Sequence, residues 1–122
     1  MKGRFTVSAM LLMASAMVLP PRHIAKAATK QPKTIQIDAR RFSFDPTEVT
    51  LKQDVPVTIA LHALDATHGL RVTQLGVELK AGKGDTAVQT ITPSTLGEFV
   101  GHCSNFCGAG HGGMAITFHV VP

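Results

Sequence analysis

Residues 97–120 read GEFVGHCSNFCGAGHGGMAITFHV, and this stretch decides the fold of the chain. Its last part, residues 115–120, alternates apolar and polar side chains, which is typical of a half-buried β-strand. Residues 97–101 form the strand that precedes it. The loop between the two strands is rich in glycine, which lets the backbone turn tightly and bring several side chains to one point. This loop carries two thiols, an imidazole and a thioether: Cys103, Cys107, His111 and Met114.

The alternation with a period of two continues through the rest of the chain. Residues 35–38, 49–51 and 55–62 place apolar side chains at every second position. No segment of helix length has a helical period, and turn-forming residues separate the runs. The pattern predicts an all-β domain of about seven short strands, arranged as an antiparallel sandwich with Greek-key connections. The breaks between runs lie at residues 45–46, 53–54, 81–85 and 93–97.

The predicted core is small and aliphatic, because the chain has 6 Phe and neither Trp nor Tyr. A core of this size gives limited stability by itself, so a bound metal would add to the stability of the domain. The apolar phases of the strands give the predicted core members: Ile35, Ile37, Phe44, Val49, Leu51, Val57, Ile59, Leu61, Leu70, Val72, Phe99, Ile116, Phe118 and Val120.

The N-terminal residues have the order of a secretory signal peptide. Lys2 and Arg4 form a basic start, residues 7–19 are apolar and uncharged, and residues 25–27 form a small-x-small cleavage site. The apolar run of 13 residues is shorter than the roughly 20 that a membrane-spanning helix needs, which favours a cleaved signal over a retained anchor. The protein is therefore expected in the periplasm or another extracytoplasmic compartment. The chain is divided into a signal peptide (1–27), a flexible tail (28–33) and one β-domain (34–122).

The positive charge of the chain belongs to this N-terminal segment. The full sequence has 12 Lys and Arg residues against 8 Asp and Glu residues, a net charge of +4. Four of the basic residues and none of the acidic ones precede residue 28, so the predicted mature chain has no net charge. A neutral domain gives no support to nucleic-acid binding. Cleavage also leaves Met114 as the only methionine of the predicted mature chain.

Sulfur ligands combined with imidazole favour copper, zinc or iron–sulfur chemistry over magnesium or calcium. A second imidazole, His68, lies on an earlier loop, 35 residues before Cys103. One Cys, His and Met on a loop, with a His from an earlier loop, is the blue-copper arrangement, and the second cysteine departs from it. Zinc would be satisfied by two Cys and two His, but it would leave Met114 without a role. A disulfide between Cys103 and Cys107 is the metal-free alternative for an exported protein.

The segment Cys103-Ser104-x-x-Cys107-Gly108-x-x-His111-x-x-Met114, with His68 upstream, resembles the CuA domain of cytochrome c oxidase subunit II. The resemblance runs from about residue 34 to residue 121 and implies a cupredoxin-like Greek-key β-sandwich. It also implies a mixed-valence pair of copper ions bridged by the thiolates of Cys103 and Cys107. The other implied ligands are two histidines, one axial thioether and one axial backbone carbonyl: His68, His111, Met114 and Asn105.

Three features depart from that family. Membrane-spanning helices precede the domain in oxidase subunit II, whereas only a signal-like segment precedes it here. Asn105 stands where the family usually has Glu, which matters little because the ligand is the backbone carbonyl. The chain has no Trp, so the Trp-rich stretch through which the family receives electrons from cytochrome c is missing. The resemblance to the family therefore supports a copper site in this chain more fully than it supports docking to cytochrome c.

The sequence thus predicts an extracytoplasmic one-electron transfer protein with a binuclear copper site. We recognise no catalytic triad or acid–base pair, so we expect no catalysis by the chain alone; its place would be the electron-entry component of a cytochrome c oxidase. The implied partners are redox proteins, among them cytochrome c and a terminal oxidase, and no nucleic acid. Membrane contact would come through an uncleaved N-terminal segment or a membrane complex. The alternatives are a carrier that holds one copper in the same ligands and a metal-free binding module with a disulfide.

Overall fold

The computed structural model describes residues 15–19 and 31–122. The predicted signal peptide, residues 1–27, and the start of the predicted tail lie outside the described residues, apart from residues 15–19. Within the described ranges the chain forms nine β-strands and two 3₁₀ turns. No helix in these ranges has the length and the hydropathy needed to cross a membrane.

The strands follow the alternating runs of the sequence. The four predicted breaks fall at strand ends or between strands, where turn-forming residues are tolerated. The strands are β1 (Lys33–Arg40), β2 (Ser43–Asp45), β3 (Glu48–Lys52), β4 (Val57–Ala63), β5 (His68–Val72), β6 (Val77–Ala81), β7 (Thr86–Ile91), β8 (Gly97–His102) and β9 (Ala115–Val121). The 3₁₀ turns are η1 (Thr73–Leu75) and η2 (His111–Gly113).

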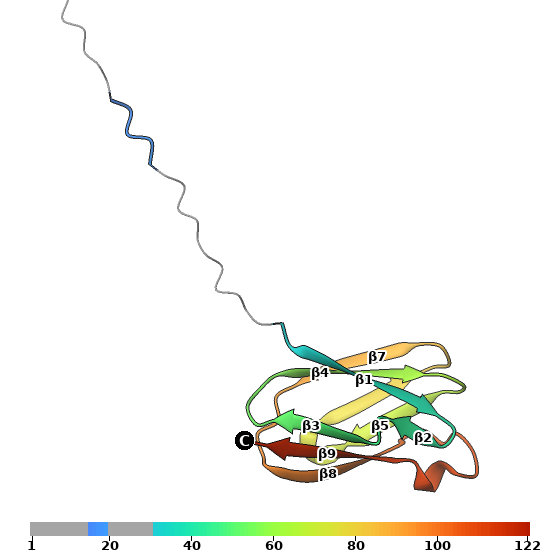
Figure 1. Ribbon diagram of the computed structural model, residues 1–122. Coiled ribbons are helices and arrows are strands. Elements are labelled where there is room, and N and C mark those ends of the chain that lie inside the picture. The colour runs from blue at the N-terminus through green and yellow to red at the C-terminus, as the bar shows by residue number, and fades with distance from the viewer. Residues whose placement is uncertain (1–14, 20–30) are drawn as a thin grey trace, which may run out of the picture.

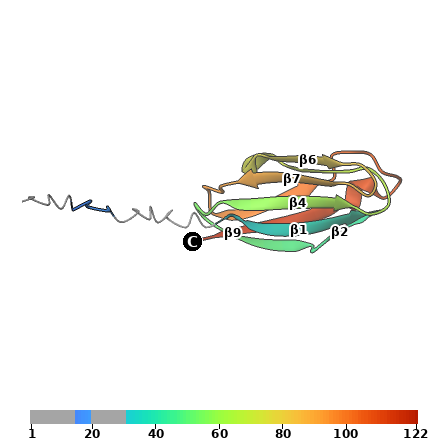
Figure 2. The same ribbon diagram turned by 90° about the horizontal axis from the view of Figure 1, so that it is seen from above.

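The nine strands of the described part build two sheets that pack face to face (Figures 1 and 2). One sheet has the order β2-β1-β4-β7, and the other has the order β3-β9-β8-β5-β6. The chain changes sheet after β2, β3, β4, β6 and β7, so that neighbours in a sheet are often distant in the sequence. This arrangement confirms the predicted all-β, cupredoxin-like sandwich.

Two pairs of strands differ from the antiparallel pairing expected from the sequence. β1 runs parallel to β4, with Lys33 opposite Val57, and β3 runs parallel to β9, with Glu48 opposite Thr117. The remaining pairs are antiparallel. The parallel pairs arise because their members are joined by crossovers between the sheets, and a crossover does not force the reversal of direction that a hairpin does.

The core lies between the sheets and is made by the apolar phases of their strands. All predicted core residues are buried except Ile35 and Phe99, which are half-buried and pack against the edge of the core. Strand β6, whose residues are not among the predicted core members, adds Val77, Leu79 and Ala81. The core also extends to Cys103, Cys107 and Met114, so the predicted ligand loop is built directly on it.

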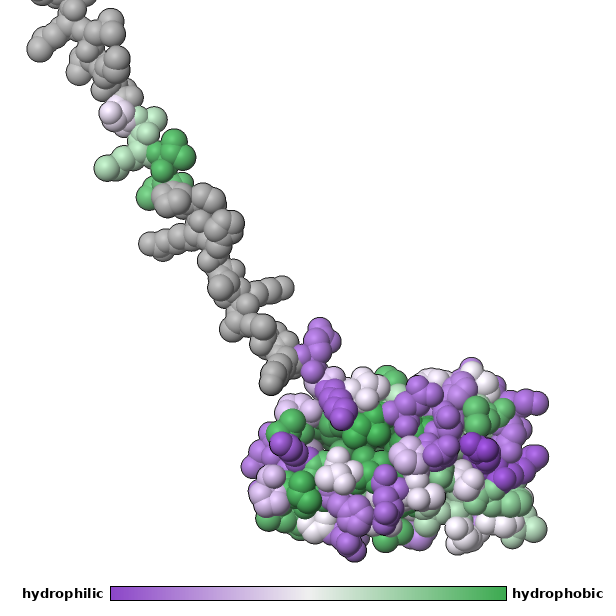
Figure 3. Space-filling view, viewed as in Figure 1, coloured by the Kyte–Doolittle hydropathy of each residue, from purple (hydrophilic) through white to green (hydrophobic). Residues whose placement is uncertain are grey.

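Two regions of the surface lie at opposite ends of the sandwich. The β1–β2 turn, the β4–β5 connection and the long β8–β9 loop gather at the end away from the C-terminus (Figure 1). Near the other end, the face between β1 and β3 shows an apolar strip among mostly polar side chains (Figure 3). A groove of about 260 Å³ lies there, lined by Ile35, Leu51, Val55 and Val57 among others. The predicted metal ligands all belong to the first of these ends.

Candidate metal centre

The ligand loop is fixed at its base by the two strands that it joins. The Cys103 N–H donates to the Met114 carbonyl at 3.2 Å, which continues the ladder between β8 and β9 by one step. Inside the loop, the His111 N–H donates to the Gly108 carbonyl at 3.1 Å, and the Met114 N–H donates to the His111 carbonyl at 3.2 Å. Gly108 has a φ of +144°, a conformation that favours glycine. In the loop held by these bonds, Cys103, Cys107 and Met114 are buried and His111 is half-buried.

His68 is brought to the loop by the first residues of β5. Its side chain is fully buried, and in the register of the sheet it stands opposite Ala81 of β6. The Ser104 N–H donates to the carbonyl of the next residue, Gly69, at 3.4 Å. A side chain at position 69 would overlap the hydroxyl of Ser104, so glycine allows the loop to approach this closely. The predicted ligand that is distant in the sequence therefore lies beside the cysteines.

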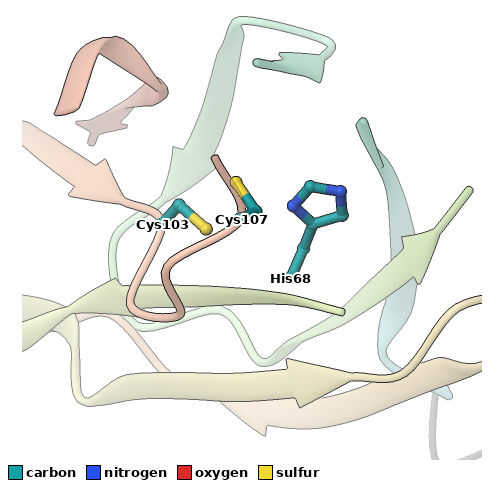
Figure 4. A group of neighbouring side chains, drawn as sticks. All are labelled: His68, Cys103 and Cys107. Carbon is teal, nitrogen blue, oxygen red and sulfur yellow. The ribbon is translucent and has the colours of Figure 1, made fainter. Parts of the chain in front are cut away.

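The structure brings the six predicted ligand positions into one cluster. The donor atoms of His68, Cys103 and Cys107 all lie within 4.8 Å of one another, and Figure 4 shows the three side chains together. The Cys107 sulfur lies 3.8 Å from Nδ1 of His111 and 4.0 Å from Sδ of Met114. The Cys103 thiol donates to the backbone carbonyl of Asn105 at 3.1 Å. Both cysteines are free thiols.

The cluster is shielded on the core side and more open on the loop side. His68 and Met114 are fully buried, and Cys103 and Cys107 are 5% and 8% exposed. His111 is half-buried. The Phe106 ring lies 5.6 Å from the His111 ring but is 76% exposed, so it borders His111 rather than sealing the site. Water is excluded from the thiols chiefly by the core.

The hydrogen bonds of His68 fix which ring nitrogen faces the cluster. Nε2 lies 2.7 Å from Oδ1 of Asp65, so this nitrogen carries the proton that a carboxylate accepts. Nδ1 is buried and has no hydrogen-bond partner. A buried polar atom normally has a partner, and an imidazole nitrogen with a free lone pair is a metal ligand. The orphaned Nδ1 beside two thiols therefore fits a soft metal ion such as copper or zinc.

Two pKa shifts describe the electrostatics of the cluster. The hydrogen bond with His68 lowers the pKa of Asp65, and the Arg41 N–H, which donates to Oδ2, lowers it further. Burial raises the pKa of the Cys107 thiol, and the charge of Cys103 and the hydrogen bond with it add to this effect. The metal-free site therefore favours a protonated thiol at Cys107, and a metal ion would displace that proton on binding.

Sequence reasoning missed three residues that support the cluster. Asp65 lies three positions before His68, and a carboxylate so close to a predicted histidine ligand is a signal that could have been read. Arg41 and Phe42 come from the β1–β2 turn and give no such signal, because the residues that they contact at the site lie 24 or more positions away in the sequence. The Arg41 Nε–H donates to the Cys107 carbonyl at 2.9 Å, and the Phe42 ring lies against Gly108 and Gly110.

This combination of fold and site defines a class of protein. Residues 7–116 match the family model of the cupredoxin-like domain. The match spans most of the chain, so the protein belongs to the cupredoxin-like family. Together, the fold and the group formed by His68, Cys103 and Cys107 support copper as the metal of this centre.

Within this class the chain is similar to subunit II of cytochrome oxidases. It is 35% identical to cytochrome c oxidase subunit 2 of Branchiostoma floridae over 85 residues, which are 70% of this chain and 36% of that protein. The chain therefore spans about a third of the length of the curated relatives it matches. These similarities confirm the resemblance predicted from the sequence.

Solved structures show the same fold at lower identity. The periplasmic domain of subunit II of cytochrome oxidase from Bradyrhizobium japonicum is 19% identical, with a TM-score of 0.67, over 73% of this chain and 83% of that domain. Auracyanin A, a "blue" copper protein from Chloroflexus aurantiacus, is 18% identical, with a TM-score of 0.60, over 75% of this chain and 100% of that protein. At these identities the likeness establishes the fold alone.

Proposed function

We propose that this protein is an extracytoplasmic one-electron carrier whose ligand loop, with His68, holds two copper ions. In this proposal the thiolates of Cys103 and Cys107 would bind both ions, His68 and His111 would each bind one of them, and Met114 and the Asn105 carbonyl would be the weaker ligands. The observation that carries the proposal is the pair of free, buried thiols in one group with the orphaned Nδ1 of His68.

The distribution of donors favours two ions over one. A blue-copper site uses one cysteine, two histidines and a weak axial ligand. Here the Cys107 sulfur has an imidazole and a thioether within 4.0 Å, while the Cys103 sulfur has a carbonyl at 3.1 Å. Each cysteine thus has additional donors of its own, and His68 lies close to both. A single ion would leave part of this donor set unused.

The surroundings of the cluster suit electron transfer. Bound copper supplies the one-electron redox change. The chain holds the ligands on a sheet ladder and on buried core positions, which limits their movement when the charge of the site changes. Met114 and His68 are fully buried, and the exclusion of water there reduces the solvent rearrangement that accompanies a change of charge.

The resemblance to oxidase subunit II supports a redox protein as partner, and a terminal oxidase as the setting. The periplasmic location of the Bradyrhizobium domain supports export of this chain, as does the signal-like order of residues 1–27. The function that we assign to the chain is electron transfer at the copper centre.

A copper carrier that binds one ion in the same ligands is the second candidate. The observation in its favour is the unequal exposure of the ligands. His111 is half-buried beside an exposed Phe106, whereas His68 and Met114 are fully buried. A metal donor protein could reach the site from the His111 side. In such a carrier the copper would be held as Cu(I) and exchanged readily.

Copper loading of the reduced protein separates the two functions. Metal analysis should give two copper ions per chain, and the EPR spectrum should show one unpaired electron shared equally by two copper nuclei. A single copper with a mononuclear spectrum, or one exchangeable Cu(I) without an EPR signal, would refute the binuclear proposal and favour the carrier. Arg40→Gln, an exposed change outside the ligand set, serves as the matched control and should load like the unaltered chain.

A further inference from the structure

The turn between β1 and β2 contacts both segments that carry predicted ligands. The Arg41 Nε–H donates to the Cys107 carbonyl at 2.9 Å. The backbone N–H of Arg41 donates to Oδ2 of Asp65 at 2.9 Å, and Oδ1 of the same carboxylate lies 2.7 Å from Nε2 of His68. Arg41 is thus bonded directly to the ligand loop and, through Asp65, to the histidine that comes from β5.

The neighbouring Phe42 ring occupies the space beside two glycines of the loop. A Cβ at Gly110 would lie 2.5 Å from Cγ of Phe42, and a Cβ at Gly108 would lie 2.9 Å from Cε1 of the same ring. Gly110 has a φ of −89°, which any residue can adopt, so the ring and not the backbone requires a glycine there. By contrast, a Cβ at Gly112 or Gly113 would meet nothing within 4 Å.

We propose that Arg41 and Phe42 form a clamp that holds the ligand loop in its metal-binding shape before any metal enters. The loop has glycines at positions 108, 110, 112 and 113, and ordering so much glycine is costly in conformational entropy. A loop that is already ordered avoids part of this cost when it binds a ligand. Arg41 and Phe42 are positioning residues in this proposal, because neither supplies a donor atom to the metal.

The inference rests on the proposed function for the identity of the ligands, but the clamp acts in the metal-free protein and is tested there first. Cys107 is buried, with 8% of the residue exposed, so alkylation by a small thiol reagent requires the loop to open. Arg41→Gln removes the bond to the Cys107 carbonyl and keeps the backbone bond to Asp65. The charge of Arg41 also lowers the pKa of Cys107, so the rates are compared per thiolate, the form that reacts. On that basis we expect alkylation at Cys107 to become about fivefold faster, the factor for loss of one hydrogen bond of typical net strength.

The matched control for Arg41→Gln is Arg40→Gln, which removes the neighbouring arginine from an exposed ion pair with Asp45. It should alkylate at the rate of the unaltered protein. Mass spectrometry of the reagent-labelled peptides gives the rate at each cysteine. Equal rates for the two variants would overturn the role of Arg41. Far-ultraviolet circular dichroism of each metal-free variant confirms that the sandwich is intact before the rates are compared.

A second pair of variants tests Phe42 without reference to Arg41. Gly110→Ala should displace the ring and speed alkylation of Cys107, whereas Gly112→Ala, where the added methyl meets open space, should not. In a Phe42→Ala background, Gly110→Ala should add little, because the ring that it collides with is gone. Additive effects of the two changes would overturn the contact between Phe42 and the loop as the cause.

Copper-loaded protein provides the readout that a merely structural role would leave unchanged. Arg41→Gln should lose copper to a chelator faster and alter the EPR hyperfine pattern, while Arg40→Gln does neither. Arg41→Lys keeps the charge but lacks the planar Nε–H donor, so it should behave like Arg41→Gln if geometry is what matters. A protein that bound no copper would refute the proposed function and leave the alkylation test of the clamp valid.

Discussion

The two predicted histidine ligands lie in regions of different construction. His68 begins a central strand, is fully buried, and has its Nε2 held by Asp65 at 2.7 Å. His111 begins a 3₁₀ turn among glycines, is half-buried, and contacts the exposed ring of Phe106. One imidazole is part of the folded core, and the other stands at the edge of the site. The difference indicates that the β5 side fixes the geometry of the centre and the loop side gives access to it.

The two cysteines lie on the loop, and their thiols also lie beside His68 of β5. Loss of a thiol should therefore have the largest effect on copper binding. Cys107→Ser replaces the soft sulfur that lies within 4.0 Å of both His111 and Met114 with a hard oxygen. We expect the copper content to fall from two ions per chain to one or none, with loss of any shared-electron EPR signal. Metal analysis and EPR of the reconstituted variant check this. Retention of two ions would contradict a bridging role for this cysteine.

Substitution of each histidine should separate ligation from folding. In the metal-free protein, His68→Ala should destabilise the fold by roughly 1–3 kcal/mol, because a cavity remains in the core while an unpaired buried nitrogen is removed. His111→Ala should change the stability by less than about 0.5 kcal/mol, as expected for a partly exposed loop position. Urea unfolding of the two metal-free variants measures both values. Equal destabilisation by the two substitutions would contradict the view that His68 belongs to the core and His111 to the edge of the site.

The same two variants should agree in copper binding even though they differ in stability. Each removes one predicted terminal ligand, so each should fail to retain two ions against a chelator. If His111→Ala kept both ions, His111 would border the entrance to the site without binding copper. His102, which is exposed and adjacent to Cys103, offers a control position: His102→Ala should retain the copper content of the unaltered chain.

Much of this site could be predicted from the sequence, because its ligands lie at fixed spacings on one short loop. Cys103, Cys107, His111 and Met114 fall within 12 positions, and a short glycine-rich segment between two strands has few ways to place them apart. His68 could be predicted as a ligand from its distance to Cys103 and from the family resemblance, and the structure places it beside the cysteines. The sandwich followed from alternation with a period of two.

The parallel strand pairs and the clamp could not be predicted in the same way. The pairing of β1 with β4 depends on which sheet receives β3, and no local pattern in the sequence records that choice. The bond from Arg41 to Cys107 spans 66 positions and joins two irregular segments, so neither periodicity nor motif spacing indicates it. Such contacts are properties of the packed fold and follow from the topology after it is known.

Asp65→Asn weakens the support of His68 in the buried β5 region without removing a predicted ligand. The amide can no longer accept the His68 proton as a charged partner, so the ring loses part of its fixed orientation and of its basicity. We expect copper affinity to fall by about 10- to 100-fold, the usual range for such supporting carboxylates. Competition with a Cu(I) chelator measures this. An affinity equal to that of the unaltered protein would mean that core packing alone orients His68.

The smallest effect is expected on the outer face of β5, three positions beyond His68. Arg71 bonds to Glu78 on β6 at 2.5 Å, and this bond lowers the pKa of Glu78, with the charge of Arg71 adding to the effect. A carboxyl with a lowered pKa adds stability above its unfolded pKa, near 4.5, and loses it as the pH falls through the lower folded value. Glu78→Gln should therefore slightly flatten the decline of melting temperature below pH 4.5. Because the pair is exposed and points away from the core, copper content and EPR spectrum should not change; a change in either would show that the rigidity of the His68 side extends through the sheet to its outer face.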